Sequence, residues 1–539
     1  MMRNINLNAV FTYRSSLTRI LFIVMLLVGV LIFRDYGMSF DEPVSRDNGG
    51  ISLRYVLERL YPSLIQSDPI LKDIAIPLNS YRDRDYGVAF DMPVFAIERL
   101  LSFNDSSEQF YLRHLLTFFV FWLSSIAFFQ IARLRYPDGH LALIGTFFYF
   151  ISPRIFSESF YNNKDIVFMS LGVICTLTLL KFLKNPSLRN AAFHAMVSAL
   201  TIDIRITGVI FPALTIVFFL LNTQARTWAW PLVACRALAY LALTLVVTII
   251  CWPWLWDAPL AKLKLAFLNM SNFRWPNFNL YLGQYVSAQK LPWHYPIVWI
   301  VTTTPPIYLL LASVGFLRIV EQFYKLGLSV FTSFRSMIDY VAFSILFGSL
   351  TAVIFLNSTL YDGWRQLYFV YPALLILSLS GVASIVAILS KLGLLWVRCF
   401  YFGLVVCVSM TAIWMINAHP YQNVYFNLLA PRQWSDYFDG DYWGLSNLEG
   451  LKFIAKHDGQ NPIRVAALGA NSIAQSLMLM PAETRSRFEF VANEDAADYL
   501  ITNFRFLAPS ENIILKEHWK KIYSVTIDNN DILNVFTKR

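Results

Sequence analysis

Charged residues are scarce in this sequence. Asp, Glu, Lys and Arg make up 15% of its 539 residues, whereas soluble domains carry about 25%. Hydrophobic residues make up 56%. A charged side chain at the centre of a bilayer costs about 2.5–3.5 kcal/mol on insertion scales. The composition therefore excludes a string of ordinary soluble domains and predicts a chain that lies mostly in a membrane.

Cysteine is also scarce, and its spacing excludes two kinds of site. All five cysteines lie in or beside apolar runs, and none has the spacing of metal ligands. The histidines form no H-x-x-x-H pair, so we predict no zinc site. We expect the cysteines to be small buried hydrophobic residues rather than a disulfide framework. They are Cys175, Cys235, Cys251, Cys399 and Cys407.

Motifs for nucleotides and nucleic acids are missing. The sequence has no G-x-G-x-x-G, no P-loop and no solenoid repeat. Its net charge of +9 does not indicate nucleic acid, because Lys and Arg are spread through short loops without a basic stripe. The first apolar run lacks a small-residue cleavage site, so we expect an uncleaved first span.

Long apolar runs are what the sequence has instead. About 20 apolar residues cross the hydrocarbon as a helix. We predict an all-α polytopic membrane protein with about 11 transmembrane helices, to which a small C-terminal α/β domain is attached. Runs 139–153 and 190–204 are short, which is typical of tilted pairs or broken helices. The candidate spans are 18–34, 114–132, 139–153, 166–183, 190–204, 206–222, 231–252, 295–317, 338–357, 366–388 and 393–415.

The distribution of Lys and Arg indicates the orientation. Cytoplasmic loops are richer in these residues than exterior ones. With a cytoplasmic N-terminus, the cytoplasmic side carries about 14 of them and the short exterior loops carry about 4. We therefore expect a cytoplasmic segment 1–17, a membrane domain 18–415, exterior loops 35–113 and 253–294, and an exterior tail 416–539. In a bacterium, this orientation places the tail and the exterior loops in the periplasm and the spans in the inner membrane.

The tail has the pattern of a small α/β domain. Amphipathic periodicity indicates helices, and short apolar runs indicate strands. The last strands form a hairpin that is expected to turn at Asn529-Asn530. The predicted elements are helices 446–457 and 471–480, strands 463–468, 487–492 and 498–503, and the hairpin 521–536.

Acidic residues open two exterior segments. Asp41 and Glu42 follow the first span directly. Adjacent carboxylates at a membrane surface suit acid/base chemistry, in which one is the base and the other holds substrate or a helix. The pattern around Asp41 recurs around Asp91, where six of nine positions of Tyr36–Val44 and Tyr86–Val94 agree. A capped helix start is the alternative at these positions, because Asp followed by Pro suits a first helical turn.

A second exterior loop carries Arg154, Lys164 and Asp165, the last where the fourth span begins. These charges either line a site or serve as a helix cap with flanking charges.

Two further arginines and a histidine lie at span ends. An unpaired Arg205 would cost free energy in a membrane. Its partner is either Asp203 or a phosphate bound by the guanidinium. Arg365 begins the tenth span, either as a second phosphate clamp or as an interface arginine whose head reaches water. His294, in Pro-Trp-His-Tyr-Pro, suits substrate binding or an aromatic belt at the interface.

Taken in order, these motifs resemble those of membrane glycosyltransferases of the C-type fold, in particular the family 39 protein O-mannosyltransferases and the bacterial lipid A aminoarabinose transferases. The resemblance covers roughly residues 15–450. The tail beyond it differs from the β-trefoil or periplasmic domains of well-known members, which leaves the acceptor open. The matching motifs are Asp41-Glu42, Arg154 with Asp165, Arg205-Ile206-Thr207-Gly208, the Trp-Arg pair at Arg365, the run from His419 to Asn427, and Asp441-Tyr442-Trp443-Gly444-Leu445.

The resemblance implies an inverting transfer of a sugar from a polyprenyl-phosphate donor to a lipid, glycan or protein acceptor on the exterior side. It implies that Asp41 is the general base and that Glu42 or Asp165 positions the acceptor or the base. Membrane lipids are further partners, and no nucleic acid is expected. No cofactor is predicted, although related oligosaccharyltransferases use a divalent metal at such acids. The implied donor-phosphate ligands are Arg205, Arg365, Arg154 and Lys164, and the implied substrate-loop residues are Asp91 and His294.

Two other classes stay open. A polymerase or ligase of surface polysaccharide also uses polyprenyl-linked sugars, but from a diphosphate carrier. A transporter or lipid flippase typically has inverted repeats and charges at mid-membrane, whereas the charges here cluster at span ends on one side.

Overall fold

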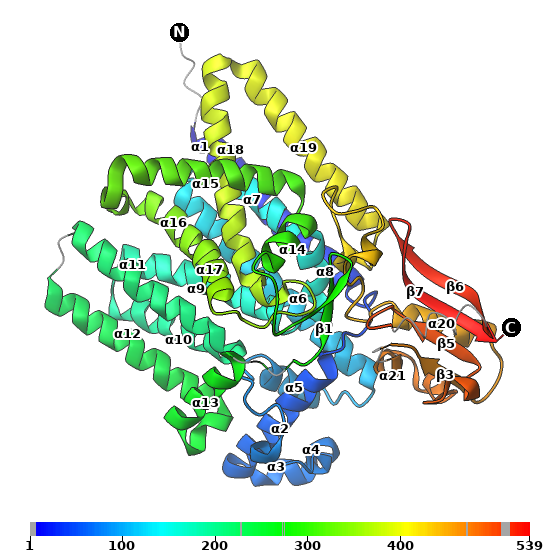
Figure 1. Ribbon diagram of the computed structural model, residues 1–539. Helices are drawn as coiled ribbons and strands as arrows, with labels where there is room; N and C mark the ends of the chain where they lie inside the picture. Colours follow the sequence, from blue (N-terminus) through cyan, green and yellow to red (C-terminus); the bar gives the residue numbers. More distant parts are fainter. Residues whose placement is uncertain are drawn as a thin grey trace.

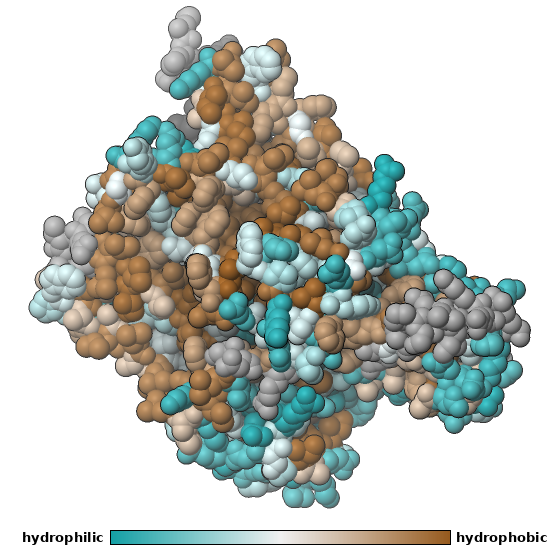
Figure 2. All heavy atoms as spheres, in the orientation of Figure 1, coloured by the Kyte–Doolittle hydropathy of each residue, from teal (hydrophilic) through white to brown (hydrophobic). Residues whose placement is uncertain are grey.

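A computed structural model describes residues 7–226, 229–271, 273, 275–469, 473–507 and 518–538. A large helical body carries a small sheet domain at one side of one end (Figure 1). Figure 2 shows hydrophobic side chains over much of the helical body and hydrophilic ones gathered over the helices of the first exterior loop and over the sheet domain. The chain is an integral, multi-pass membrane protein.

Within the described residues, seven helical segments are long and apolar enough to cross a membrane. Three shorter apolar helices accompany them. The predicted number of 11 spans is not confirmed by these lengths. The long segments are α6 (Ser106–Arg135), α9 (Asp165–Lys184), α12 (Trp230–Cys251), α15 with η4 (Pro306–Thr332), α16 to α17 (Phe334–Phe355), η6 with α18 (Arg365–Leu392) and α19 (Leu394–Asn417); the shorter ones are Ser16–Ile32 of α1 (Leu7–Ile32), α7 (His140–Phe150) and Ile206–Asn222 of η2 and α11 (Ile206–Val209, Ile210–Arg226).

The predicted span 190–204 is the helix α10 (Leu188–Ile204), and it is buried inside the body. It packs between α9 and α12. His194 on this helix hydrogen-bonds Thr178 Oγ1 at 2.7 Å and Thr215 Oγ1 at 2.8 Å. Polar side chains are therefore satisfied by neighbouring helices rather than by lipid, which explains a helix that is less apolar than its neighbours.

The predicted span 295–317 is wrong in its bounds. The chain forms α14 (Tyr295–Thr303), turns, and then forms α15 (Pro306–Leu326). Pro305 and Pro306 cause the break, because proline has no N–H for the helix ladder and restricts the residue before it. Pro306 then suits the first turn of the new helix. The membrane-length segment is shifted to Pro306–Thr332.

The helices α15 and α18 (Tyr371–Leu392) touch through their backbones. A Cβ added to Gly381 would lie 2.0 Å from the carbonyl oxygen of Leu311, and one added to Gly315 would lie 2.0 Å from that of Leu377. Small residues let membrane helices approach this closely. This helix pair carries Arg365 at the start of η6 (Arg365–Val370), which leads directly into α18.

The two long loops that are predicted to be exterior contain regular secondary structure in their described residues. The first is mostly helical, and the second ends in a two-stranded hairpin. The short loop after α7 forms a buried helix, α8 (Pro153–Tyr161). The elements of the two long loops are α2 (Glu42–Leu60), α3 (Pro62–Ser67), α4 (Pro69–Asp73), η1 (Leu78–Ser80) and α5 (Asp91–Leu100), then η3 (Pro253–Asp257), α13 (Pro259–Ser271), β1 (Phe278–Tyr281) and β2 (Gln284–Ser287).

The tail forms one five-stranded sheet with the order β4-β3-β5-β7-β6. Strand β3 is parallel to β4 and β5, and β7 is antiparallel to β5 and β6. The hairpin turns at Asp528-Asn529, one residue earlier than predicted, because both residues have positive φ, 49° and 61°, as a two-residue type I′ turn requires. The tail elements are α20 (Asn447–His457), β3 (Ile463–Ala467), α21 (Ile473–Ser476), η9 (Leu477–Leu479), α22 (Ala482–Arg485), β4 (Phe488–Phe490), η10 (Glu494–Ala496), β5 (Tyr499–Thr502), β6 (Trp519–Ile527) and β7 (Asn530–Lys538).

The sheet domain is packed onto the body. Ser106 Oγ at the start of α6 donates to the carbonyl of Met478 at 2.7 Å. Trp414 Nε1 near the end of α19 donates to the carboxylate of Asp528 at 2.9 Å. Buried side chains of α20 and β7 belong to the same hydrophobic cluster as those of the helical body. The tail therefore has a fixed position beside the exterior loops.

Candidate active site

Asp41 lies directly before α2, where a cap would be expected, but its side chain does not cap the helix. The side chain is 36% exposed, and its Oδ2 lies 3.1 Å from Nη1 of Arg365. Among the described residues, this is the one ion pair of Asp41. The Asp41 side chain therefore lies partly exposed at the edge of the cluster.

Glu42 faces the opposite way. Its carboxylate is buried, lies 2.9 Å from Nε2 of His114 and accepts the backbone N–H of Ser39 at 2.6 Å. The Ser39 hydroxyl in turn donates to the carbonyl of Tyr161 at 3.1 Å. Glu42 thus ties the end of the first span to α6, and its bond to the Ser39 N–H fixes the turn that precedes α2.

Arg365 is at the centre of the charged cluster. Its Nη1 lies 3.1 Å from both Asp41 Oδ2 and Asp165 Oδ2, and its Nη2 lies 3.3 Å from Asp362 Oδ2. The guanidinium carbon lies 4.7 Å from the ring centre of Tyr361 and 4.5 Å from that of Trp443. The aromatic rings and the three carboxylates therefore fix its position.

Asp165 begins α9 and is shared by two arginines. It forms ion pairs with Arg365 and Arg205, and it accepts a hydrogen bond from Asn162 Nδ2 at 3.2 Å. Its side chain is 1% exposed. Arg205 follows α10, and its Nε has no hydrogen-bond partner among the described residues. Because its carboxylate is saturated and shielded, Asp165 is suited to hold the two arginines side by side.

Asp203, the alternative partner of Arg205, is used elsewhere. Its Oδ1 accepts the backbone N–H of Val88 at 2.6 Å and that of Ala89 at 3.1 Å. A Cβ added to Gly87 would lie 1.5 Å from the carbonyl oxygen of Asp203, so glycine is required for this approach. The contact fixes the segment before α5 onto the end of α10.

Asp91, where the sequence pattern around Asp41 recurs, holds other side chains in place rather than facing the cluster. Asp91 is buried and accepts hydrogen bonds from Arg113 at 3.0 Å and Asn163 at 2.7 Å. Lys164, the neighbour of Asn163, lies with Nζ 3.3 Å above the ring of Tyr86. Burial, and then the nearby charge of Arg205, lower the pKa of Lys164. Asp91 therefore supports the loop that presents Lys164 and Asp165.

Two of the predicted site residues lie outside the cluster. Arg154 on α8 donates through Nε to the carbonyl of Tyr425 at 3.0 Å, with its guanidinium carbon 4.7 Å from the ring centre of Phe426. His294 lies at the N-terminus of α14 and hydrogen-bonds the hydroxyl of Tyr281 at 2.6 Å. Neither makes an ion pair with the acids around Arg365 within the described chain.

Two residues join the cluster that the sequence did not single out. Asp362 bridges two arginines, with Oδ2 facing Arg365 and Oδ1 lying 2.6 Å from Nη2 of Arg505. Asp362 has a positive φ of 54° beside Gly363 at 76°, and the Asp-Gly pair was the available signal for such a turn. Arg505 comes from the tail, and no sequence pattern indicated that a residue so far along the chain would pair with Asp362.

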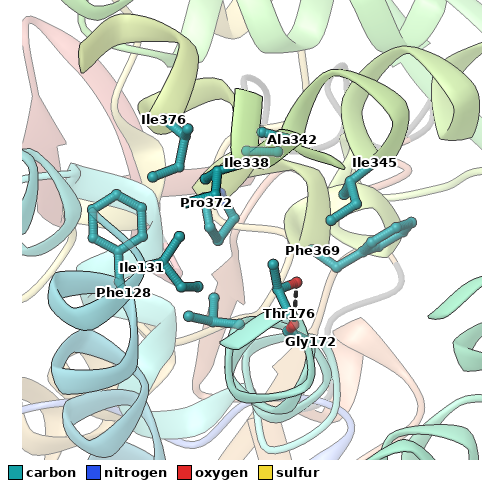
Figure 3. Close-up of a pocket in the computed structure, with 12 residues that line it drawn as sticks. Phe128, Ile131, Gly172, Thr176, Ile338, Ala342, Ile345, Phe369, Pro372 and Ile376 are labelled. Carbon is teal, nitrogen blue, oxygen red and sulfur yellow. Dashed lines mark hydrogen bonds between the residues drawn. The ribbon is translucent and has the colours of Figure 1, made fainter. Parts of the chain in front are cut away.

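An apolar cavity lies beneath this cluster, between α6, α9, α16 (Phe334–Phe343) and α18. Figure 3 shows Phe128, Ile131, Ile376 and Phe369 around it, and a hydroxyl, that of Thr176, bonded to the carbonyl of Gly172 at 2.8 Å. Its volume is about 30 Å³. The helices on two of its sides begin at Asp165 and Arg365, so its apolar walls continue directly from the charged cluster.

Comparisons with known proteins give a match in structure alone. No protein-family model and no curated protein matches the chain. The chain is similar to two solved structures of ArnT from Cupriavidus metallidurans. The one bound to undecaprenyl phosphate has 14% identity and a TM-score of 0.46, with 96% of this chain and 97% of that chain covered. The apo structure has 12% identity and a TM-score of 0.47, with 97% and 98% covered.

Proposed function

We propose that the chain is a membrane glycosyltransferase that moves a sugar from a polyprenyl-phosphate carrier to an acceptor at the exterior face, with Asp41 as general base. One observation carries the proposal: Asp41 is a carboxylate with 36% exposure held by Arg365, next to the buried carboxylates of Glu42 and Asp165. A base must reach the substrate, and Asp41 meets this condition where Glu42 and Asp165 do not.

The transfer requires removal of the acceptor hydroxyl proton and stabilisation of the negative charge on the leaving phosphate. The acceptor hydroxyl oxygen attacks the anomeric carbon, and Asp41 takes the hydroxyl proton. The bond from the anomeric carbon to the phosphate oxygen breaks on the opposite face, so the configuration inverts and polyprenyl phosphate leaves. The negative charge that develops on the leaving phosphate requires fixed cations. Arg365, Arg205 and Lys164 lie around Asp165 and supply them.

The two arginines are suited to a phosphate. The Nε atoms of both Arg205 and Arg365 are buried and have no hydrogen-bond partner among the described residues. A guanidinium offers a planar fork of N–H groups that matches phosphate oxygens. The small apolar cavity between α9 and α18 begins at Gly172, seven residues after Asp165, and at Phe369, four residues after Arg365, so a lipid chain attached to such a phosphate would meet apolar side chains on these helices.

The test is Asp41→Asn, which removes the proton acceptor and nearly conserves the shape. With synthetic polyprenyl-phosphate pentoses and hexoses as donors and envelope glycolipids and glycans as acceptors, we expect release of polyprenyl phosphate to slow by about 10²–10⁴. Asp257→Asn is the matched control, because Asp257 is an exterior carboxylate with 41% exposure beside Lys262 and Arg59. The control should retain wild-type rates. An Asp41→Asn protein with near-normal turnover would show that Asp41 is not the base.

A further inference from the structure

A second cavity lies between the sheet domain and the exterior segments of the body. Its volume is about 490 Å³, within the range of about 300–1,000 Å³ that is usual for ligand pockets. Four stretches of chain line it: the hairpin of β1 and β2, residues 433–442, residues 503–507 after β5, and the turn between β6 and β7. None of these stretches belongs to the apolar cavity beneath Arg365.

The lining combines aromatic rings with polar groups. Tyr285, Trp434 and Phe438 supply rings, and asparagines supply amides. Within the described residues, Trp434 Nε1 and Asn534 Oδ1 are buried without a hydrogen-bond partner. Buried polar atoms are rarely left unpaired. The amide and carboxyl groups of the lining offer both donors and acceptors to a ligand in the cavity.

The charges around this cavity oppose an anionic ligand. Four acids line it, Asp436, Asp439, Asp441 and Asp531, against a single base, Arg505, which is already paired with Asp362. Across the described chain, no three acids, histidines or cysteines converge as metal ligands. A phosphorylated headgroup or a metal ion is therefore disfavoured, and a neutral polar ligand is favoured.

Asp439 is suited to a hydroxyl-bearing ligand. Its Oδ2 accepts the backbone N–H of Leu280 at 3.0 Å. Burial, only partly opposed by this N–H, raises the pKa of Asp439 to about 7. Near neutral pH the carboxyl group is therefore present both protonated and ionised, so it donates to one hydroxyl group and accepts from another.

Arg505 separates this cavity from the charged cluster. It lines the cavity and pairs with Asp362, which contacts Arg365. Its guanidinium carbon lies 5.6 Å from the ring centre of Phe40, the residue before Asp41. The cavity is therefore linked to the proposed base through Arg505, Asp362 and Arg365.

We propose that this cavity is a binding site for a neutral saccharide and that it holds a distal part of the acceptor glycan, on the other side of Arg505 from Asp41. The role as acceptor site rests on the proposed function, whereas binding of the saccharide does not. Aromatic faces stack against the apolar faces of sugar rings, and the amides and carboxyl groups exchange hydrogen bonds with the hydroxyl groups.

The test is saturation-transfer NMR on the purified full-length protein with neutral trisaccharides of glucose, mannose and N-acetylglucosamine. We expect saturation transfer to at least one of them, and an affinity roughly tenfold lower in Tyr285→Ala, the effect of losing one aromatic contact. Tyr285 is 49% exposed, so its loss leaves the core intact. Tyr437→Ala is the matched control, because Tyr437 lies beside the same hairpin and is 39% exposed but does not line the cavity. The control should bind as the wild type does.

Additional measurements distinguish a failure of this inference from a failure of the proposed function. Asp41→Asn should bind the trisaccharide normally, because Asp41 does not line the cavity. If no trisaccharide binds, or if Tyr285→Ala and Tyr437→Ala bind equally well, the inference is wrong even when sugar transfer is intact. Binding of lipid A or of a Ser/Thr peptide that is equally weakened by Tyr285→Ala, without binding of saccharides, would also overturn it. Saccharide binding without use of any polyprenyl-phosphate donor would instead contradict the proposed function.

Discussion

The adjacent carboxyl groups of Asp41 and Glu42 lie in different environments because their partners come from different helices. Arg365, far along the chain, draws Asp41 outward, and His114 with the Ser39 N–H holds Glu42 inward. The sequence predicted the acidic pair. It could not assign the roles, because each role depends on a side chain that only the tertiary fold brings near.

Glu42→Gln should therefore affect the fold more than the chemistry. The variant loses the charge beside His114 and weakens the hydrogen bond from the Ser39 N–H, and a lost buried hydrogen bond costs about 1–3 kcal/mol. We expect a lower melting temperature in detergent, with kcat of the folded fraction within severalfold of wild type. A fall in kcat as large as that of Asp41→Asn, at an unchanged melting temperature, would place Glu42 in the chemistry instead.

Arg365→Lys should keep the charge and lose the fork. A lysine ammonium cannot reach Asp41, Asp165 and Asp362 with the geometry that the guanidinium has. We expect use of the polyprenyl-phosphate donor to fall by at least about tenfold in kcat/KM, which corresponds to about 1.4 kcal/mol. Arg464→Lys is the control, since Arg464 also pairs with an aspartate, Asp498, but on the exposed face of the sheet domain. Equal kinetics in both variants would remove Arg365 from donor binding.

Local patterns predicted most of the arginine and acid positions of the candidate site, because charges between apolar runs are conspicuous. Asp165 was expected where α9 begins, and the structure places it there beside Arg205 and Arg365. Arg505 could not be predicted as a site residue, because it follows β5 in the tail. Local sequence does not show where the tail domain packs on the helical body. Arg154 was predicted in the site but lies outside it. The carbonyl of Tyr425 and the ring of Phe426, which hold its guanidinium, are distant in sequence and could not be anticipated.

At the scale of elements, the length of an apolar run predicts a helix well where the helix faces lipid. It predicts a helix less well where the helix is surrounded by protein. The helix α10 is predicted in place, yet its polar side chains are bonded inside the body. In the first long loop, the Asp-x-Pro pattern gave helix starts at Asp41 and Asp91 as an alternative, and α2 and α5 begin there. The lengths of these helices and the presence of α3 and α4 were not predicted, because sequence periodicity does not distinguish a short helix packed on protein from a polar loop. The Pro305-Pro306 break was readable from sequence, but the apolar run continues across it.

The contact between α15 and α18 gives a test of helix packing. Gly381→Ala would place a Cβ 2.0 Å from the carbonyl oxygen of Leu311, so the two helices must separate. Overpacking of this kind costs about 1–3 kcal/mol. We expect a lower melting temperature and a smaller folded fraction in size-exclusion chromatography. Gly403→Ala in α19 is the control, since an added Cβ meets nothing within 4 Å, and it should be neutral or stabilising. Equal stability of the two variants would contradict the close approach.

At the scale of the whole molecule, one end of the body collects the charged cluster, the ordered exterior loops and the sheet domain. Asp41 directly precedes α2 at this end, Asp165 and Arg365 begin helices there, and Arg505 links the sheet domain to them. A lipid-linked sugar stays at the membrane interface, so an enzyme for it needs its polar groups at such an end. The opposite end carries the loop around Gly393 between α18 and α19, with Lys391 nearby.

This arrangement predicts the side of the membrane on which the tail lies. The excess of Lys and Arg in the loops opposite the charged cluster favours the cytoplasm for those loops, and the tail is packed at the cluster end. Alkaline phosphatase fused after Arg539 should therefore be active in bacterial cells, and a green fluorescent protein fused there should be dark. The matched control is a fusion after Gly393, which interrupts the chain between α18 and α19 and should give the reverse pattern. Fluorescence after Arg539 together with phosphatase activity after Gly393 would invert the molecule and place the proposed base in the cytoplasm. Phosphatase activity at both positions would mean that α19 does not cross the membrane.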